Sequence, residues 1–183
     1  GGDTDLELDA KETENVLNTF NEIQEIWVPF IFNVELIIQT WPEINNSLDH
    51  VVSNNENLYA TVNSTLTKMQ KTVGSATMLT AGTLRSLVES ITKNILLYSR
   101  YRNEKYLLTG SEKLKRADRI LKGLLNGDKE LGLEKIKSAT TRRDILEIEK
   151  QFNKHSEKVK AIFEKLPVVL EATSYIAENN IPL

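Results

Sequence analysis

The chain has 183 residues, of which 40% are hydrophobic and 27% are charged, and its formal net charge is −3. This length fits one domain or one elongated double module, and the hydrophobic fraction is sufficient for a buried core. Cysteine is absent and histidine occurs only twice, which excludes disulfides, thiol catalysis and thiolate or histidine-rich metal sites.

The first predicted helix runs from about residue 9 to residue 39, and Pro29 is expected to bend it. A turn is predicted at residues 40–42, because proline suits the first position of a new helix. The second helix then covers residues 42–73. Its apolar stripe includes Asn55, a polar residue of the kind that sets the register of paired helices.

Two further helices are predicted in the middle of the chain. Residues 74–82 begin and end with glycine, and we interpret them as either a weak point in one long helix or a short break and hinge. The third helix covers residues 83–108 and stops at the Thr-Gly pair 109–110, because glycine favours the geometry of a helix C-terminus. A short helix then spans residues 111–125, with a serine at its N-cap.

The last part of the chain is predicted to begin with a turn and loop at residues 126–140. A long helix follows over 140–165, a turn lies at 166–167, and a final helix reaches residue 179. No strand pattern of period two and no run of 18 apolar residues occurs. The sequence therefore predicts an all-α fold, an elongated antiparallel bundle of about six helices, with no membrane-spanning helix in this segment.

A heptad stripe, in which apolar residues alternate at spacings of four and three, occurs twice. The first copy consists of Val16, Phe20, Ile23, Trp27, Phe30, Val34, Ile37, Trp41, Ile44, Leu48 and Val51. The second consists of Ile145, Ile148, Phe152, His155, Val159, Ile162, Leu166, Val169, Thr173 and Ile176, each 125 positions after its counterpart. This spacing is typical of helices packed side by side, and Pro42 has its counterpart in Pro167. We therefore predict a duplicated helical module in which Trp27 and Phe152 are both buried.

The charges are unevenly distributed along the chain. Residues 1–60 hold 12 acids and one base, residues 61–124 hold 12 bases and four acids, and residues 125–183 hold ten of each. Either the basic middle packs against the acidic start, or it holds a site for an anion or an acidic lipid. Three acids, Glu104, Glu112 and Asp118, dilute the basic cluster, so nucleic-acid binding is not expected.

No catalytic, phosphate-binding or metal-binding motif was found, and neither an enzyme nor a cofactor is predicted for this segment. His155, at the position of Phe30 in the first copy, is interpreted as a partly buried core histidine. Arg85 follows Thr83 at the start of the third predicted helix, where it could fork onto a small oxyanion or form an ordinary surface ion pair. Arg85 is the first candidate for ligand contact, and Thr83 and Arg100 are weaker ones.

Several segments resemble the NarX/PilJ-type sensor domain. Residues 81–87 (Ala-Gly-Thr-Leu-Arg-Ser-Leu), followed by 91–97 (Ile-Thr-Lys-Asn-Ile-Leu-Leu), are similar to the helix that opens this domain. Residues 117–127 resemble its short second helix, 148–152 its third helix, and 20–30 the third helix of a preceding module. The asparagine pairs at 54–55 and 179–180 match its closing helix. Residues 1–73 thus look like the second half of one module and residues 74–183 like a complete one.

This resemblance implies a periplasmic, dimeric four-helix bundle held by membrane helices in an inner-membrane protein. It implies a receptor that passes a ligand signal to a kinase or a chemotaxis module by helix displacement. Arg85 would then contact an anionic ligand, although Glu89, where the chain departs from the family, would repel nitrate. Residues 106–112 (Tyr-Leu-Leu-Thr-Gly-Ser-Glu) also resemble a helix end of extracytoplasmic chemoreceptor sensors. The alternative is a coiled-coil scaffold or interaction module without a small ligand.

Overall fold

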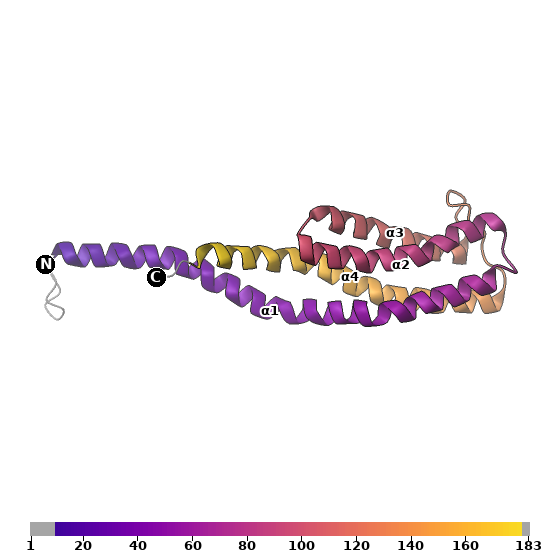
Figure 1. The fold of residues 1–183 in the computed structure, drawn as a ribbon, viewed down its shortest axis with the longest axis horizontal. Helices are drawn as coiled ribbons and strands as arrows, with labels where there is room; N and C mark the ends of the chain where they lie inside the picture. Colours follow the sequence, from indigo (N-terminus) through magenta and orange to yellow (C-terminus); the bar gives the residue numbers. More distant parts are fainter. Residues whose placement is uncertain (1–9, 181–183) are drawn as a thin grey trace. The chain divides into compact units, whose positions relative to one another are not determined.

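The structure is a computed structural model that describes residues 10–180, and of residues 10–12 it describes the backbone alone. This part of the chain holds four helices and no strand: α1 (Ala10–Met69), α2 (Ser75–Tyr101), α3 (Glu104–Asn126) and α4 (Ala139–Asn179) (Figure 1). The all-α prediction is confirmed, and the prediction of about six helices is wrong. Residue 9, the predicted start of the first helix, lies outside the described residues.

Helices α1 and α4 each continue through a proline at which a turn was expected. Pro42 lies inside α1 and Pro167 lies inside α4. A proline inside a helix removes one backbone hydrogen bond and bends the axis, which costs about 3 kcal/mol. Apolar side chains next to both prolines, Ile44 and Leu166, are buried, and their burial offsets that cost. The predicted turns at 40–42 and 166–167 are therefore wrong.

The glycine-flanked segment 74–82 is helical for most of its length. The chain turns at residues 70–74, and Gly74 is the N-cap residue of α2. Gly82 lies inside the helix. The break therefore precedes this segment, and Arg85 lies ten residues after the helix start rather than at it.

The connection between α2 and α3 comes earlier than predicted. Arg102 has a φ of 53°, in the left-handed region, and this ends α2 after Tyr101. The Asn103 side chain then accepts a hydrogen bond of 3.0 Å from the backbone N–H of Lys105, which caps α3. A left-handed turn and a side-chain cap therefore separate the two helices.

Gly110 lies within α3, so the predicted helix stop at 109–110 is wrong. A Cβ atom added at Gly110 would lie 2.6 Å from Cζ of Phe163 on α4. The glycine is therefore needed for close packing between α3 and α4, and the predicted short helix 111–125 is the second part of α3.

The chain divides into two compact units. Residues 43–167 form the first, here called the bundle unit, and the described residues 10–42 and 168–180 belong to the second, here called the terminal unit. These units are defined by packing, whereas the predicted modules 1–73 and 74–183 are defined by resemblance. The module prediction therefore stays a prediction.

The bundle unit contains parts of all four helices, and its neighbouring helices run antiparallel. Asn55 of α1 accepts a hydrogen bond from Thr92 of α2 (2.9 Å), and Lys68 of α1 pairs with Asp144 of α4 (2.7 Å). Glu43, near the opposite end of this part of α1, pairs with Lys165. The second heptad stripe forms much of the core. Its members Ile145, Ile148, Phe152, His155, Val159, Ile162 and Leu166 are each at most 2% exposed.

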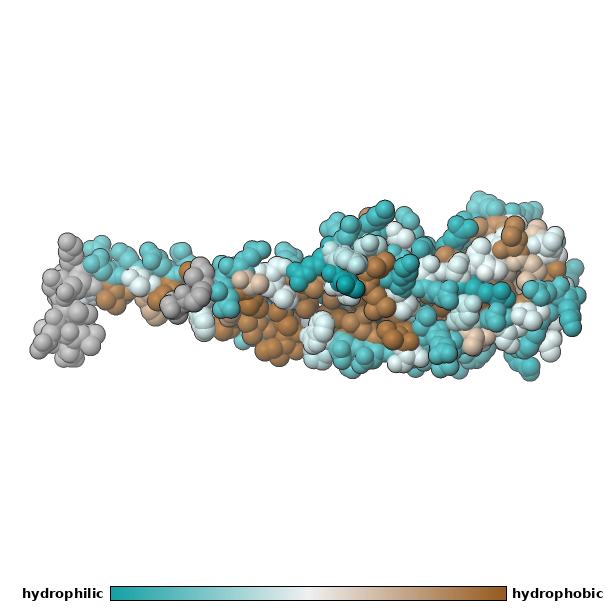
Figure 2. Space-filling model, in the orientation of Figure 1, coloured by the Kyte–Doolittle hydropathy of each residue, from teal (hydrophilic) through white to brown (hydrophobic). Residues whose placement is uncertain are grey.

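The terminal unit contains most of the first heptad stripe. Val16, Phe20, Ile23 and Trp27 are each 53–57% exposed, whereas the stripe residues 30, 34 and 37 are half-buried. Figure 2 shows hydrophobic residues at the surface along this part of α1. The prediction that Trp27 is buried is wrong, and the same prediction for Phe152 is confirmed. The difference arises because the terminal unit has fewer helical segments available to cover a stripe.

Candidate functional site

Two of the three predicted ligand contacts lie together in one open groove between α1 and α2. The groove has a volume of about 640 Å³. It is lined by Leu66, Gln70, Ser75, Met78, Leu79, Gly82, Thr83, Arg85 and Ser86. The structure thus places Arg85 and Thr83 of α2 in the lining of the same groove as Leu66 of α1.

Arg85 is the only charged residue that lines this groove. It is half-buried, and its Nε atom is one of four buried side-chain polar atoms that have no hydrogen-bond partner among the described residues. Thr83 is already engaged, because its hydroxyl donates to the carbonyl of Thr80 at 2.7 Å. Since Arg85 lies inside α2, the free N–H groups of a helix N-terminus are not available beside it. An anion here would rely on the guanidinium.

Arg100 does not belong to this groove. It follows Arg85 by 15 residues on the same helix, which corresponds to about 22 Å along the axis. Its side chain is exposed, and the guanidinium carbon lies 5.4 Å from the centre of the Tyr101 ring. The structure therefore offers Arg100 a cation–π contact and separates it from Arg85.

Part of the basic middle of the chain forms ion pairs with acids. Arg119 binds Asp128 at 2.7 Å and Glu130 at 2.5 Å, and these two carboxylates raise the pKa of Arg119. Lys122 binds Asp118 at 2.7 Å, one helical turn away. Of the three acids that dilute the cluster in the sequence, Asp118 forms an ion pair among the described residues.

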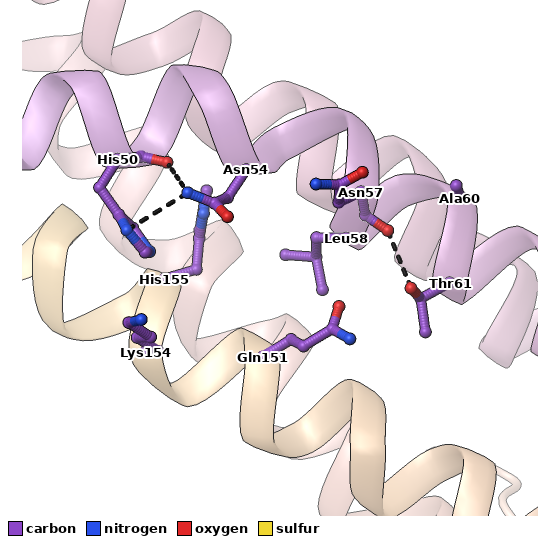
Figure 3. Close-up of a pocket in the computed structure, with 9 residues that line it drawn as sticks. All are labelled: His50, Asn54, Asn57, Leu58, Ala60, Thr61, Gln151, Lys154 and His155. Carbon is purple, nitrogen blue, oxygen red and sulfur yellow. Dashed lines mark hydrogen bonds between the residues drawn. The ribbon is translucent and has the colours of Figure 1, made fainter.

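A second pocket, which the sequence did not indicate, lies between α1 and α4 in the bundle unit (Figure 3). Its volume is about 520 Å³. It is lined by His50, Asn54, Asn57, Leu58, Ala60, Thr61, Gln151, Lys154 and His155. We call it the histidine pocket, because both histidines of the chain contribute to it.

His155 is the most unusual residue of the histidine pocket. Its side chain is 1% exposed, and neither ring nitrogen has a hydrogen-bond partner among the described residues. Burial, followed by the neighbouring His50, lowers the pKa of His155 to about 4. The ring is therefore neutral at physiological pH, and leaving its polar atoms unpaired costs stability unless a bound group satisfies them.

His50 approaches the same space from α1 (Figure 3). The Asn54 amide donates to the backbone carbonyl of His50 at 2.9 Å and lies 3.3 Å from the ring nitrogen Nδ1. Because an amide nitrogen can only donate, Nδ1 accepts and the proton of the neutral ring is on Nε2. Burial, followed by Lys154 and Lys158, lowers the pKa of His50 as well.

Sequence reasoning found the burial of His155 and missed the pocket around it. The stripe position pointed to a core histidine, which burial confirms. The available signal was the exchange of Phe30 in the first copy for His155 in the second. That exchange could not identify His50, which is 105 positions earlier and meets His155 only through the antiparallel pairing of α1 and α4.

Comparison with known proteins does not assign a function to these sites. No family model matches the chain, and no curated protein matches it. Within residues 10–180, no helix combines the length and apolar composition that crossing a bilayer requires. The same residues contain no cluster of three or more His, Asp or Glu side chains arranged to hold a metal ion. The function of the chain is therefore inferred from the geometry of the sites.

Proposed function

We propose that this chain is the ligand-sensing domain of a membrane receptor, located outside the cytoplasm and serving chemotaxis or two-component signalling. The observation that supports this function is the state of Arg85. Arg85 is half-buried, its Nε is unpaired, and no carboxylate accompanies it among the described residues that line the groove. A small anion would fill that role through a forked pair of hydrogen bonds.

The position of the groove suggests how binding would be transmitted. Leu66 in the last turn of α1 and Gln70 just after it line the same groove as Arg85 and Thr83 of α2. A ligand that contacts both helices binds most tightly to one of their packings, and so it shifts the population toward that packing. Displacement of α2 along α1 by a fraction of a helical turn is a known form of such a change.

The exposed stripe of α1 supports a homodimer as the signalling form. The stripe residues Val16, Phe20, Ile23 and Trp27 are exposed, and the positions that flank this stripe between residues 17 and 40 are Leu17, Thr19, Gln24, Ile26, Ile31, Asn33, Ile38 and Thr40. None is charged, so a second copy could pair along the stripe without charge repulsion. The same stripe favours the second candidate function, an interaction module that binds a partner helix and no small ligand.

A ligand screen by thermal unfolding tests the sensor function, with the inorganic anions nitrate and phosphate as probes. A ligand present at 100 times its dissociation constant should raise the free energy of unfolding by about 2.7 kcal/mol. Arg85→Ala should abolish the shift, and Arg100→Ala, a matched removal of an arginine outside the groove, should leave it intact. If every probe is without effect, or if the shift persists in Arg85→Ala, the groove is not the sensing site and the interaction module becomes the better explanation.

A further inference from the structure

The histidine pocket supports an inference that does not depend on the receptor function. We propose that this pocket binds a small organic acid, whose carboxylate is held by His155 and Lys154. The pocket lies between α1 and α4, whereas the Arg85 groove lies between α1 and α2. The two sites share no lining residue, so each can be tested without disturbing the other.

The charge of the lining residues selects an anion. Among the described residues that line the pocket, Lys154 is the only one that is cationic at neutral pH, and none is a carboxylate. Lys158, one turn further along α4, adds a second positive charge that acts on His50. A metal cation would meet this positive field with only two imidazoles as ligands, which disfavours it.

The hydrogen-bonding groups of the pocket match a carboxylate in number and type. His155 has two unpaired ring nitrogens, one of which is a donor in the neutral ring. His50 carries its proton on Nε2 because Asn54 occupies Nδ1. Together with the Lys154 ammonium, the site offers up to three donors to two carboxylate oxygens. Hydrogen bonds to an ionised acceptor are roughly twice as strong as neutral ones. A bound carboxylate would therefore offset the free-energy cost of burying the unpaired ring nitrogens of His155.

The remaining lining explains why the ligand should be an organic acid rather than a bare inorganic anion. A pocket of about 520 Å³ is larger than a phosphate ion needs. Leu58 and Ala60 provide apolar surface for a carbon chain, and the amides of Asn57 and Gln151 provide polar contacts at its far end. Small-molecule sites commonly combine apolar walls with a few polar anchors in this way.

Binding of acetate, succinate and citrate to the whole chain, measured by calorimetry at pH 7, tests the proposal. At least one of these acids should bind, and His155→Phe and Lys154→Gln should each weaken it at least about tenfold, the effect of losing one hydrogen bond to a charged group. His155→Phe installs the residue of the first copy, so it keeps the size of a core side chain. Lys160→Gln removes an exposed lysine of the same helix that does not line the pocket, and it should leave the affinity unchanged.

Further probes separate this site from its alternatives. Arg85→Ala should leave the binding of organic acids unchanged. A negative result for the proposed ligand site in the Arg85 groove can therefore be distinguished from a negative result for the histidine pocket. The proposal is overturned if none of the three acids binds, if binding survives both pocket variants, or if only inorganic phosphate binds. It is also overturned if Zn²⁺ binds instead and His155→Phe abolishes that binding, because the pocket would then be a metal site. Circular dichroism of each variant verifies that its helices are intact.

Discussion

The two heptad stripes have the same spacing and opposite surroundings. In the bundle unit, the second stripe is buried from Ile145 to Leu166. In the terminal unit, the first stripe is exposed from Val16 to Trp27. The aromatic pair Trp27 and Phe30, whose ring centres lie 5.8 Å apart, stacks within α1. Periodicity therefore predicts which face of a helix is apolar, and the number of neighbouring helices decides whether that face is covered.

The largest expected difference between the stripes lies at the equivalent positions Phe152 and Trp27. Phe152→Ala should lower the free energy of unfolding by about 3–5 kcal/mol, because it leaves a cavity in the bundle core. Trp27→Ala should lower it by less than about 1 kcal/mol, because the indole is already half in water. Urea denaturation followed by circular dichroism measures both changes.

The same pair of variants tests whether a second copy covers the first stripe. Trp27→Ala should weaken self-association in a dilution series followed by sedimentation. Phe152→Ala should instead lower the free energy of unfolding of the individual chain. Equal losses of stability from both variants at concentrations where the protein is monomeric would contradict the difference in burial.

A pH titration of stability should distinguish His155 from its counterpart Phe30. The folded chain holds the pKa of His155 at about 4, whereas the unfolded chain has the usual value of about 6.5. Between these values the unfolded state binds more protons, so the free energy of unfolding falls as the pH falls from 6.5 toward 4. The expected loss of unfolding free energy is about 3 kcal/mol. Above pH 7 His155 is neutral in both states, so none of this stability is lost there.

Denaturation of the wild type and His155→Phe between pH 4 and pH 8 isolates this effect, because carboxylates titrate equally in both proteins. The difference between the two curves should grow as the pH falls. A difference that stays constant over this range would mean that the pKa of His155 is the same in the folded and unfolded chains. His50, whose pKa is also lowered, acts in the same direction and is present in both proteins.

The smallest expected effect concerns Phe163, which corresponds to Ile38 in the first copy. Ile38 is exposed, whereas Phe163 packs over Gly110. Gly110→Ala should lower the free energy of unfolding by about 1–3 kcal/mol, because the new methyl group would meet the Phe163 ring. Gly82→Ala is the matched control in a helix with open space around it, and it should raise that energy by about 0.5–1 kcal/mol. Thermal unfolding of both variants measures these changes. If Gly110→Ala stabilised the protein, the close contact between Gly110 and Phe163 would be excluded.

The candidate sites show where sequence reasoning ends. Arg85 and Thr83 are close in the sequence, and the structure places both along the same groove. Arg100 was grouped with them by charge, and the rise along α2 separates it from them. The histidine pocket needed a pairing between α1 and α4 that no local pattern specifies. Local spacing thus determines groups within one helix, and tertiary packing determines groups across two.

The sequence by itself determined that the chain is helical and which residues form its apolar stripes, because both properties follow from the period of the α-helix. Only the tertiary structure decided that the helices pass through Pro42 and Pro167, since burial of Ile44 and Leu166 beside these prolines offsets one lost hydrogen bond at each. It also decided that one stripe is core and the other is surface, and that two distant histidines share a pocket. These outcomes depend on contacts between residues far apart in the chain, and their energies exceed local preferences.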